Sequence, residues 1–292
     1  MSALVFERPD LPTFALTSGA WRVTVFDPRA DGAALGARYV HGGYIAEVFH
    51  DGRCLTAAAK PAWDSYNGIG MPETFEESLG LNRAHDGEEF LRIGAGRVRK
   101  SDREPGHRSP LSATLNWTLT QNSPTALAME VADGAIIDGK TFSYQLHRTL
   151  RLDPSGITSE TRLKVRCPWS HTLCWYPHPF FASSACDKTA FHLPAPAHLP
   201  ACHKLSDDGL FRLAPTCPTA IAATGVWGCR QPLNVHLDPA HGGGGIQMDP
   251  SYPLDKIVLW ASPYVASLEP YWCRAWHDGE DAAWSISYRW LD

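Results

Sequence analysis

The sequence lacks the features of several large classes of protein. No stretch of about 18 apolar residues occurs, and the first residues, 1–9, contain neither a basic segment nor a sustained apolar one. The net charge of −5 provides no basic excess that would attract nucleic acid or anionic lipid. We therefore expect a cytoplasmic protein that binds neither nucleic acid nor membranes.

Recognisable metal and cofactor motifs are also lacking. None of the eight cysteines forms a CxxC pair, and without an export signal we expect all eight to be reduced. Gly242 to Gly245 are not followed by the Lys-Ser/Thr of a phosphate-binding loop. One Cys/His group has ligand types that suit zinc, but its spacing matches no familiar zinc signature. We predict no metal and no cofactor. The group comprises Cys186, His192, His198, Cys202 and His203.

Helical periodicity is scarce, and only the segment 72–79 is expected to form a short helix. Period-2 alternation, which marks strands with one buried face, is frequent. It is clearest in 142–152 and in 157–167, which flank the turn sequence Asp153-Pro154-Ser155-Gly156. Alternation also marks 284–290. Further strands are predicted at 20–26, 43–49, 90–99, 113–120, 125–132, 172–181, 218–223, 255–262 and 266–271.

Strands without intervening helices argue against a parallel α/β sheet. Hydrophobic residues make up 44% of the chain, which is enough for a sizeable core. We therefore predict an all-β protein, a large antiparallel β-sandwich with few short helices, as a single domain over residues 1–292. The 11 tryptophans are a conspicuous excess, and aromatic side chains form good platforms for the apolar faces of ligands.

Two titratable side chains lie in apolar surroundings. His178 follows Trp175-Tyr176-Pro177 and precedes Pro179-Phe180-Phe181 at the end of a predicted strand. Imidazole is the natural acid or base near neutral pH. Glu269 lies within Ala266-Ser267-Leu268-Glu269-Pro270-Tyr271-Trp272, where a carboxylate must be paired or face a polar pocket. The alternatives are a core histidine bonded to backbone and a structural ion pair, for instance with Arg274.

Carboxylates and cations cluster in residues 68–100, where they could meet the hydroxyl groups of a sugar, although such a run is more often a solvated face. Strand alternation places Arg97 and Arg99 on one face and Lys100 on the other. Arginines in the site would favour an anionic ligand, and Lys100 alone would favour a neutral one. The expected substrate-binding residues are Glu73, Glu77, Arg97 and Lys100, with Trp175 or Tyr271 as the aromatic platform.

The order of motifs along the chain resembles that of the aldose 1-epimerase (galactose mutarotase-like) superfamily. The resemblance covers the chain from about residue 20 to its end. In that family the motif histidine acts as acid and the motif glutamate as base, roles that fall on His178 and Glu269. His85-Asp86-Gly87 is a loose counterpart of a second family histidine and implies a substrate-binding role for His85. The motifs are Gly42-Gly43-Tyr44-Ile45, Phe90-Leu91-Arg92-Ile93-Gly94-Ala95-Gly96, Tyr144-Gln145-Leu146-His147-Arg148, Leu150-Arg151-Leu152, His178-Pro179-Phe180-Phe181, Leu268-Glu269-Pro270-Tyr271 and Gly279-Glu280 with Trp284.

The resemblance implies an isomerase that interconverts the α and β anomers of a small-molecule sugar or sugar phosphate without a cofactor, as a monomer or homodimer. Acid and base should then lie within reach of one pyranose ring, roughly 4–8 Å apart. Two alternatives remain open. A glycosidase or lyase would need opposed carboxylates, Glu269 with Glu73, Glu76 or Glu77. A non-catalytic carbohydrate-binding protein would need the aromatic platform alone.

Overall fold

The structure is a computed structural model that describes residues 7–101, 106–185, 187–194, 204–205, 208–213, 220–223, 228–241 and 243–291. Over these residues it is almost entirely antiparallel β-structure. The helical elements are single turns: α1 (Gly32–Leu35), η1 (Gly106–Arg108) and η2 (Pro239–His241). The predicted all-β antiparallel sandwich with few short helices is therefore confirmed.

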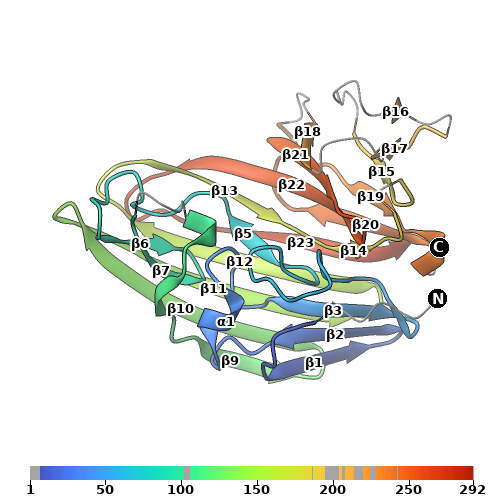
Figure 1. Cartoon of the computed structure of the whole chain (residues 1–292), viewed down its shortest axis with the longest axis horizontal. Coiled ribbons are helices and arrows are strands. Elements are labelled where there is room, and N and C mark those ends of the chain that lie inside the picture. The colour runs from blue at the N-terminus through green and yellow to red at the C-terminus, as the bar shows by residue number, and fades with distance from the viewer. Residues whose placement is uncertain are drawn as a thin grey trace.

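The largest sheet has ten strands in the order β16-β17-β15-β19-β20-β23-β12-β11-β10-β9. Its strands β10, β11 and β12 lie below β13 and β22 in Figure 1, and the ten-stranded sheet forms one layer of the sandwich. The strands are β9 (Thr118–Ser123), β10 (Ala126–Ile137), β11 (Lys140–Asp153), β12 (Gly156–Arg166), β15 (Ala190–His192), β16 (Lys204–Leu205), β17 (Phe211–Arg212), β19 (Leu233–His236), β20 (Gly245–Pro250) and β23 (Asp281–Leu291).

The second layer is a six-stranded sheet in the order β18-β21-β22-β13-β5, with β14 paired to β22. Two smaller sheets flank the layers, β1-β2-β3-β4 and β6-β7-β8. The strands of the second layer are β5 (Glu73–Phe75), β13 (His171–Pro177), β14 (Phe181–Ala182), β18 (Ala220–Ala223), β21 (Lys256–Ala261) and β22 (Val265–Trp276). The smaller sheets contain β1 (Thr13–Ser18), β2 (Trp21–Phe26), β3 (Ile45–His50), β4 (Arg53–Cys54), β6 (Glu89–Arg92), β7 (Gly96–Arg99) and β8 (Leu111–Thr114).

The hairpin of β11 and β12 shows how alternation builds the large sheet. Tyr144 pairs with Val165 and Leu146 with Leu163, and all four side chains are buried. The turn between the strands is held by Asp153, whose carboxylate accepts hydrogen bonds from the backbone N–H of Ser155 at 2.7 Å and of Gly156 at 3.2 Å. Polar residues alternate with the buried ones and face solvent, as the sequence predicts.

Aromatic side chains join the two layers. The indole of Trp175 on β13 lies 5.6 Å from that of Trp284 on β23, measured between ring centroids, and packs edge-on against it. Trp272 and Trp276 on β22 also contact Trp284. These four tryptophans therefore pack in the core between the two sheets. Aromatic pairs of this kind stabilise a core beyond the contribution of the area they bury.

Four predicted elements differ from the structure. The predicted strand 113–120 contains the end of β8 and the start of β9, which belong to different sheets, and the predicted strand 172–181 contains most of β13 and the first residue of β14. The segment 72–79 is not a helix, because Glu73–Phe75 forms β5 and pairs with β13, where all three side chains are buried. The predicted strand 90–99 is a hairpin of β6 and β7. Gly94 turns the chain with φ of 76°, and a Cβ there would lie 2.7 Å from Val40 Cγ1, so the turn requires glycine.

The expectation that all cysteines are reduced is wrong for one pair. Cys174 on β13 and Cys273 on β22 are register partners and form a disulfide across 99 residues of sequence. Adjacent antiparallel strands bring their side chains close enough to bridge, a proximity that depends on the strand register and not on the spacing of cysteines in the sequence. Cys54, Cys167 and Cys229 are free thiols.

A buried ion pair also ties the layers together. Arg148 Nη1 on β11 lies 2.6 Å from Glu73 Oε2 on β5, and both side chains are almost fully buried. Ser159 Oγ donates a 2.6 Å hydrogen bond to Glu73 Oε1, and Arg148 Nη2 donates to Ser159 Oγ at 2.9 Å. The network satisfies two charges that burial would otherwise make very costly.

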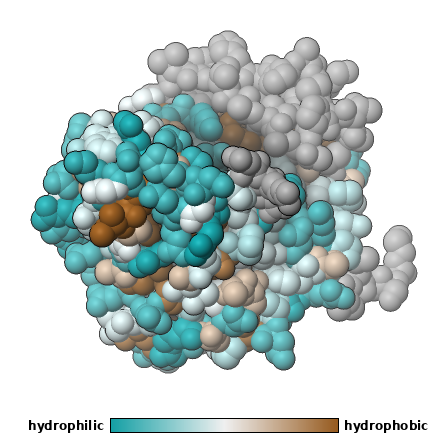
Figure 2. Space-filling view, turned by 60° about the vertical axis from the view of Figure 1, so that its left-hand side comes forward, coloured by the Kyte–Doolittle hydropathy of each residue, from teal (hydrophilic) through white to brown (hydrophobic). Residues whose placement is uncertain are grey.

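The forward surface in Figure 2 is mostly hydrophilic, with small hydrophobic areas between. Ile136 is the large hydrophobic side chain that stands out as exposed among the described residues. Within the same ranges, no helix has the length and apolar character needed to cross a membrane.

Replacing Arg148 with methionine should destabilise the protein strongly, because it would leave the carboxyl group of Glu73 buried in the core without its ion-pair partner. We expect a loss of about 3–5 kcal/mol in the free energy of unfolding, measured by urea denaturation. Arg162→Met is the control, since Arg162 forms a fork with Asp281 at the surface and its loss should cost about 1 kcal/mol or less. Similar losses for both variants would contradict this account of the network.

The disulfide predicts a specific peptide map. Alkylation of the protein under denaturing, non-reducing conditions, followed by digestion and mass spectrometry, should leave Cys174 and Cys273 unlabelled and linked to each other. Cys54, Cys167 and Cys229 should all be labelled. Recovery of alkylated Cys174 and Cys273 without prior reduction would contradict the pairing.

Candidate functional site

The candidate site lies on the face of the six-stranded sheet that points away from the ten-stranded sheet. Strand alternation creates this face: Trp175 and Trp272 point into the core, whereas Tyr176 and Tyr271, their neighbours in the sequence, point to the opposite side. The rings of Tyr176 and Tyr271 stack with centroids 4.0 Å apart. Glu269 lies two residues before Tyr271 on β22, so its side chain is on the same face of the sheet.

His178 lies just beyond the end of β13, where two prolines interrupt the ladder. Pro177 and Pro179 have no N–H to donate, so regular pairing stops there. The backbone N–H of His178 donates a 2.8 Å hydrogen bond to the carbonyl of Pro72, which fixes the residue beside β5. Its Nδ1 lies 3.2 Å from Ser267 Oγ, so the second ring nitrogen, Nε2, is directed away from that contact.

The imidazole and the carboxyl group meet directly. His178 Nε2 lies 3.3 Å from Glu269 Oε1, and the two residues are only 1% and 3% exposed. The distance is shorter than the 4–8 Å expected from the sequence.

Burial dominates the protonation of this pair. It raises the pKa of Glu269 to about 8, against the opposing effect of the Arg38 charge. Burial, together with the Arg38 charge, holds the pKa of His178 well below its usual value of 6.5. At neutral pH the carboxyl group therefore carries a proton and the imidazole is neutral, so the pair holds one proton that either group can donate.

Tyrosines complete the surroundings of Glu269. The hydroxyl of Tyr271 donates to Glu269 Oε2 at 3.5 Å, a long contact. Lys256 Nζ lies 4.0 Å from the centre of the Tyr271 ring. Burial raises the pKa of Tyr176 and that of Tyr271 above the usual range, so both side chains are neutral phenols at physiological pH.

Arg38 is a component of the site that the sequence analysis missed. Its Nη1 donates a 2.8 Å hydrogen bond to the carbonyl of Tyr66, and its guanidinium lies over the rings of Tyr39 and Tyr66. Burial lowers the pKa of Arg38, but Tyr39, Tyr176 and Glu269 outweigh that effect and the pKa is raised. The sequence signal that could have identified Arg38 is a cation within an apolar stretch, just before the Gly42-Gly43 motif.

The other predicted site residues divide between the sheet face and distant places. Glu73 and Trp175 lie in the core between the layers, against Arg148 and Trp284 respectively, because alternation turns them away from the site face. Glu77 stays near the site: its carboxylate accepts a 2.5 Å hydrogen bond from the N–H of Cys174. Tyr271 is the predicted platform residue that the structure brings to the pair.

Three predicted basic residues serve other contacts. Arg97 forks onto Asp133 of β10, with Nη2 2.6 Å from Oδ1. Lys100 Nζ donates to the carbonyls of Ala84 at 2.7 Å and Leu81 at 3.3 Å. His85 is exposed, with Nε2 3.5 Å from Asp138 Oδ1. None of these groups contacts His178 or Glu269, because β6 and β7 belong to a different sheet.

Metal binding finds no support among the described residues, where no group of three or more His, Cys, Asp or Glu side chains could hold an ion. Of the Cys/His group weighed from the sequence, His192 lies on β15. Cys186, His198, Cys202 and His203 lie outside the described residues.

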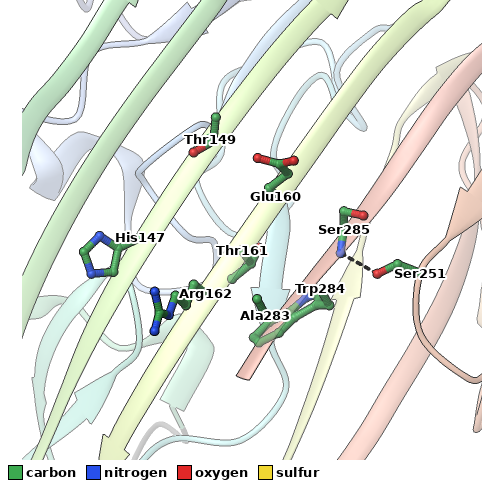
Figure 3. A pocket seen from close by; sticks show the side chains of 9 residues that line it. All are labelled: His147, Thr149, Glu160, Thr161, Arg162, Ser251, Ala283, Trp284 and Ser285. Atoms are coloured by element: carbon green, nitrogen blue, oxygen red, sulfur yellow. Dashed lines mark hydrogen bonds between the residues drawn. The ribbon is translucent and has the colours of Figure 1, made fainter. Parts of the chain in front are cut away.

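A separate hollow of about 550 Å³ lies on the outer face of the ten-stranded sheet (Figure 3). It contains His147, Glu160 and Arg162 on neighbouring strands, and Ser285 N donates a 2.7 Å hydrogen bond to Ser251 Oγ at its edge. Its histidine is paired with a carboxylate, His147 Nδ1 lying 3.0 Å from Glu130 Oε2, but these side chains are 50% and 43% exposed. Open contact with water distinguishes this pair from His178 and Glu269.

Comparison with known proteins relates the architecture to a single fold. No protein-family model and no curated protein sequence matches the chain. Solved structures do. A galactose mutarotase related enzyme from Lactobacillus acidophilus superimposes with a TM-score of 0.60 at 11% identity, over 96% of this chain and 98% of that one.

Two further structures agree. A galactose mutarotase-like protein from Lactobacillus casei gives a TM-score of 0.56 at 13% identity, over 96% of this chain and all (100%) of the other. An aldose epimerase homologue from C. elegans gives 0.55 at 11% identity, over 96% and 98% of the two chains. Agreement along nearly the whole of each chain shows that this protein has the fold of the galactose mutarotase-like superfamily.

Proposed function

We propose that this protein is an aldose 1-epimerase-like isomerase, which interconverts the α and β anomers of an aldose or sugar phosphate. The observation that carries the proposal is the contact between two buried titratable groups, with His178 Nε2 3.3 Å from Glu269 Oε1. The mutarotase-related structures with the same fold support it. A fold alone does not fix a function, so the pair has to carry the argument.

Anomer exchange requires the hemiacetal ring to open and close. A base takes the proton from the C1 hydroxyl while an acid protonates the ring oxygen, and the C1–O5 bond breaks. Rotation about C1–C2 presents the other face of the aldehyde, and the ring closes as the two groups reverse their roles. One acid and one base within reach of one carbon are sufficient, and each positioned proton transfer contributes about 10² to 10⁴ in rate.

The single proton of the pair fits this cycle. The assignment from the family resemblance makes His178 the acid and Glu269 the base, which requires the proton on the imidazole. Transfer from Glu269 Oε1 to His178 Nε2 produces that form without any net gain or loss of protons. The apolar surroundings of the pair disfavour this charged form, and the polar oxygens of a bound sugar would favour it.

Aromatic and basic neighbours supply the binding surface. The stacked rings of Tyr176 and Tyr271 can meet the C–H face of a sugar, and Arg38 can donate to its hydroxyl groups. Because the pair itself is buried, a sugar reaches it only when neighbouring side chains move. The partly exposed Arg38 and Trp260, whose ring centroid lies 5.5 Å from that of His178, are the side chains that we expect to move.

The choice between a neutral and an anionic sugar stays open. The three basic residues that would have decided it contact other parts of the protein. Arg99 Nη2 lies 3.8 Å from Glu89 Oε1, Arg97 binds Asp133, and Lys100 donates to the carbonyl of Ala84. A glycosidase that uses Glu73 as its second carboxylate is disfavoured, because Glu73 is held in the core by Arg148. Monomer or homodimer and a cytoplasmic location remain predictions, and the disulfide weighs against a reducing compartment.

Replacing either member of the pair should abolish most of the activity. We expect His178→Gln and Glu269→Gln each to slow anomer exchange by about 10²- to 10⁴-fold, measured by exchange NMR on an aldose or sugar phosphate that wild type converts. His147→Gln and Glu130→Gln are matched controls, because they alter the exposed histidine–glutamate pair of the outer face and should leave the rate unchanged. Exchange at the wild-type rate in either His178→Gln or Glu269→Gln would contradict the assignment of these two residues as acid and base.

The rate should also depend on pH in a way that follows from the one-proton pair. Above pH 8 Glu269 loses the proton that one group must donate, so kcat/KM should fall about tenfold per pH unit. Below the pKa of His178, which is well under 6.5, a second proton should remove the base and the rate should fall again. A profile that rises continuously from pH 7 to pH 9 would contradict the assignment.

A further inference from the structure

We propose that Arg92 is a positioning residue, whose guanidinium holds the backbone of Arg38 and the end of β5 together and thereby fixes the Arg38 side chain beside Glu269. The relevance of this role to catalysis rests on the proposed function. The placement of Arg92 itself does not. No contact joins Arg92 to the catalytic pair, so its effect passes through Arg38.

The guanidinium of Arg92 bonds to two chain segments at once. On one side Nε donates to the carbonyl of Ala37 at 2.9 Å, and Nη2 donates to that of Arg38 at 3.2 Å. On the other side Nη2 donates to the carbonyl of Phe75 at 2.9 Å, and Nη1 donates to that of Glu76 at 3.3 Å. One side chain thus joins the loop that carries Arg38 to the strand that lies next to β13.

Two further side chains complete the arrangement. Arg92 Nη1 donates to Ser78 Oγ at 2.9 Å, and Nη2 lies 3.0 Å from His107 Nδ1. Thr74 Oγ1 adds a 2.5 Å hydrogen bond to the carbonyl of Arg38, which strengthens the same joint. His107 accepts here as a neutral imidazole, because burial and the arginine charges lower its pKa to about 3.

Arg92 keeps its charge in the interior without a carboxylate partner. The side chain is 2% exposed, and among the described residues no carboxylate oxygen lies within ion-pair distance of it. Burial lowers its pKa to about 10, so it remains protonated at neutral pH. Backbone carbonyls and a neutral histidine solvate it instead. Burying a cation in this way costs free energy, and an apolar residue could fill the same space equally well. Packing alone therefore does not explain an arginine at this position.

The geometry connects this joint to the catalytic carboxyl group. The carbonyls that Arg92 holds belong to Arg38 and to the residue before it, so the Arg38 side chain leaves the backbone from a fixed point. The Arg38 guanidinium lies 5.0 Å from the centre of the Tyr39 ring, and that ring lies 6.1 Å from the ring of His178, the partner of Glu269. From this position the charge of Arg38 lowers the pKa of Glu269. The planar fork matters, because a lysine ammonium presents a point charge and cannot span carbonyls on both segments.

Other groups act on Glu269 as well and must be held constant in a test. They come from each element packed around it: Arg38 and Tyr39 from the loop before β3, Glu76 after β5, Tyr176 and His178 at the end of β13, Ser267 and Tyr271 on β22, and Lys256 on β21 beside Tyr271. Substituting Arg92 alters none of these side chains directly. A change in the titration of Glu269 would therefore report a displaced Arg38.

The test measures the ionisation of Glu269 without requiring turnover. Protein labelled with ¹³C at glutamate carboxyl carbons is titrated by NMR, with the Glu269 signal identified by its loss in Glu269→Gln. Without the hydrogen bonds from Arg92, the charge of Arg38 should stabilise the Glu269 carboxylate less. We expect Arg92→Gln and Arg92→Lys to raise the pKa of Glu269 by about one unit, a tenfold tighter hold on the proton. The alkaline limb of the pH–rate profile should move to higher pH by the same amount.

Ile246→Ala is the control for a general loss of stability, since Ile246 is buried on β20 of the other sheet and should leave the Glu269 titration unchanged. An unchanged pKa in folded Arg92 variants would overturn the proposal and leave Arg92 a purely structural residue, as would the failure of both variants to fold. If wild type fails to exchange the anomers of any sugar, the proposed function fails. The titration still decides the role of Arg92.

Discussion

The burial of Glu269 against His178 is the constraint on which the rest of the site depends. Removing a carboxyl group from water raises its proton affinity, and removing an imidazole from water lowers its own, so at neutral pH the carboxyl group keeps its proton and the imidazole stays neutral. The surrounding structure keeps water away and the two groups in contact. Ser267 contacts the imidazole, the hydroxyl of Tyr271 donates to the carboxyl group, and Arg38 limits how far the pKa of that carboxyl group rises.

The sheet architecture explains why these groups meet. β13 and β22 are neighbours in the six-stranded sheet, and their register places residues 174 and 273 opposite each other, where they form the disulfide. Beyond them along the same face come the tyrosine stack and then the pair itself. The opposite face carries the tryptophans that bind this sheet to the ten-stranded one. One strand thus serves the core with alternate residues and the site with the others.

Much of this could be predicted from the sequence, and the failures have two main causes. Alternation predicted the long strands, and the order of motifs singled out His178 and Glu269. Alternation within one strand cannot say which face meets the other sheet, so Trp175 was chosen where Tyr176 lies at the site. Contacts across long sequence separations were also invisible: Glu73 finds Arg148, and Cys174 finds Cys273. Such partners depend on register between strands, which local patterns do not encode.

The most direct test of the central claim is polarimetry of wild-type protein with freshly dissolved α-anomers of several aldoses and sugar phosphates. The account predicts that the protein accelerates the approach to the equilibrium rotation for at least one of these sugars, in proportion to protein concentration. The final rotation should equal that of the uncatalysed reaction, because an isomerase changes the rate and not the equilibrium. Relaxation at the buffer rate for every sugar would contradict the claim that the buried pair is an acid–base catalyst of anomer exchange.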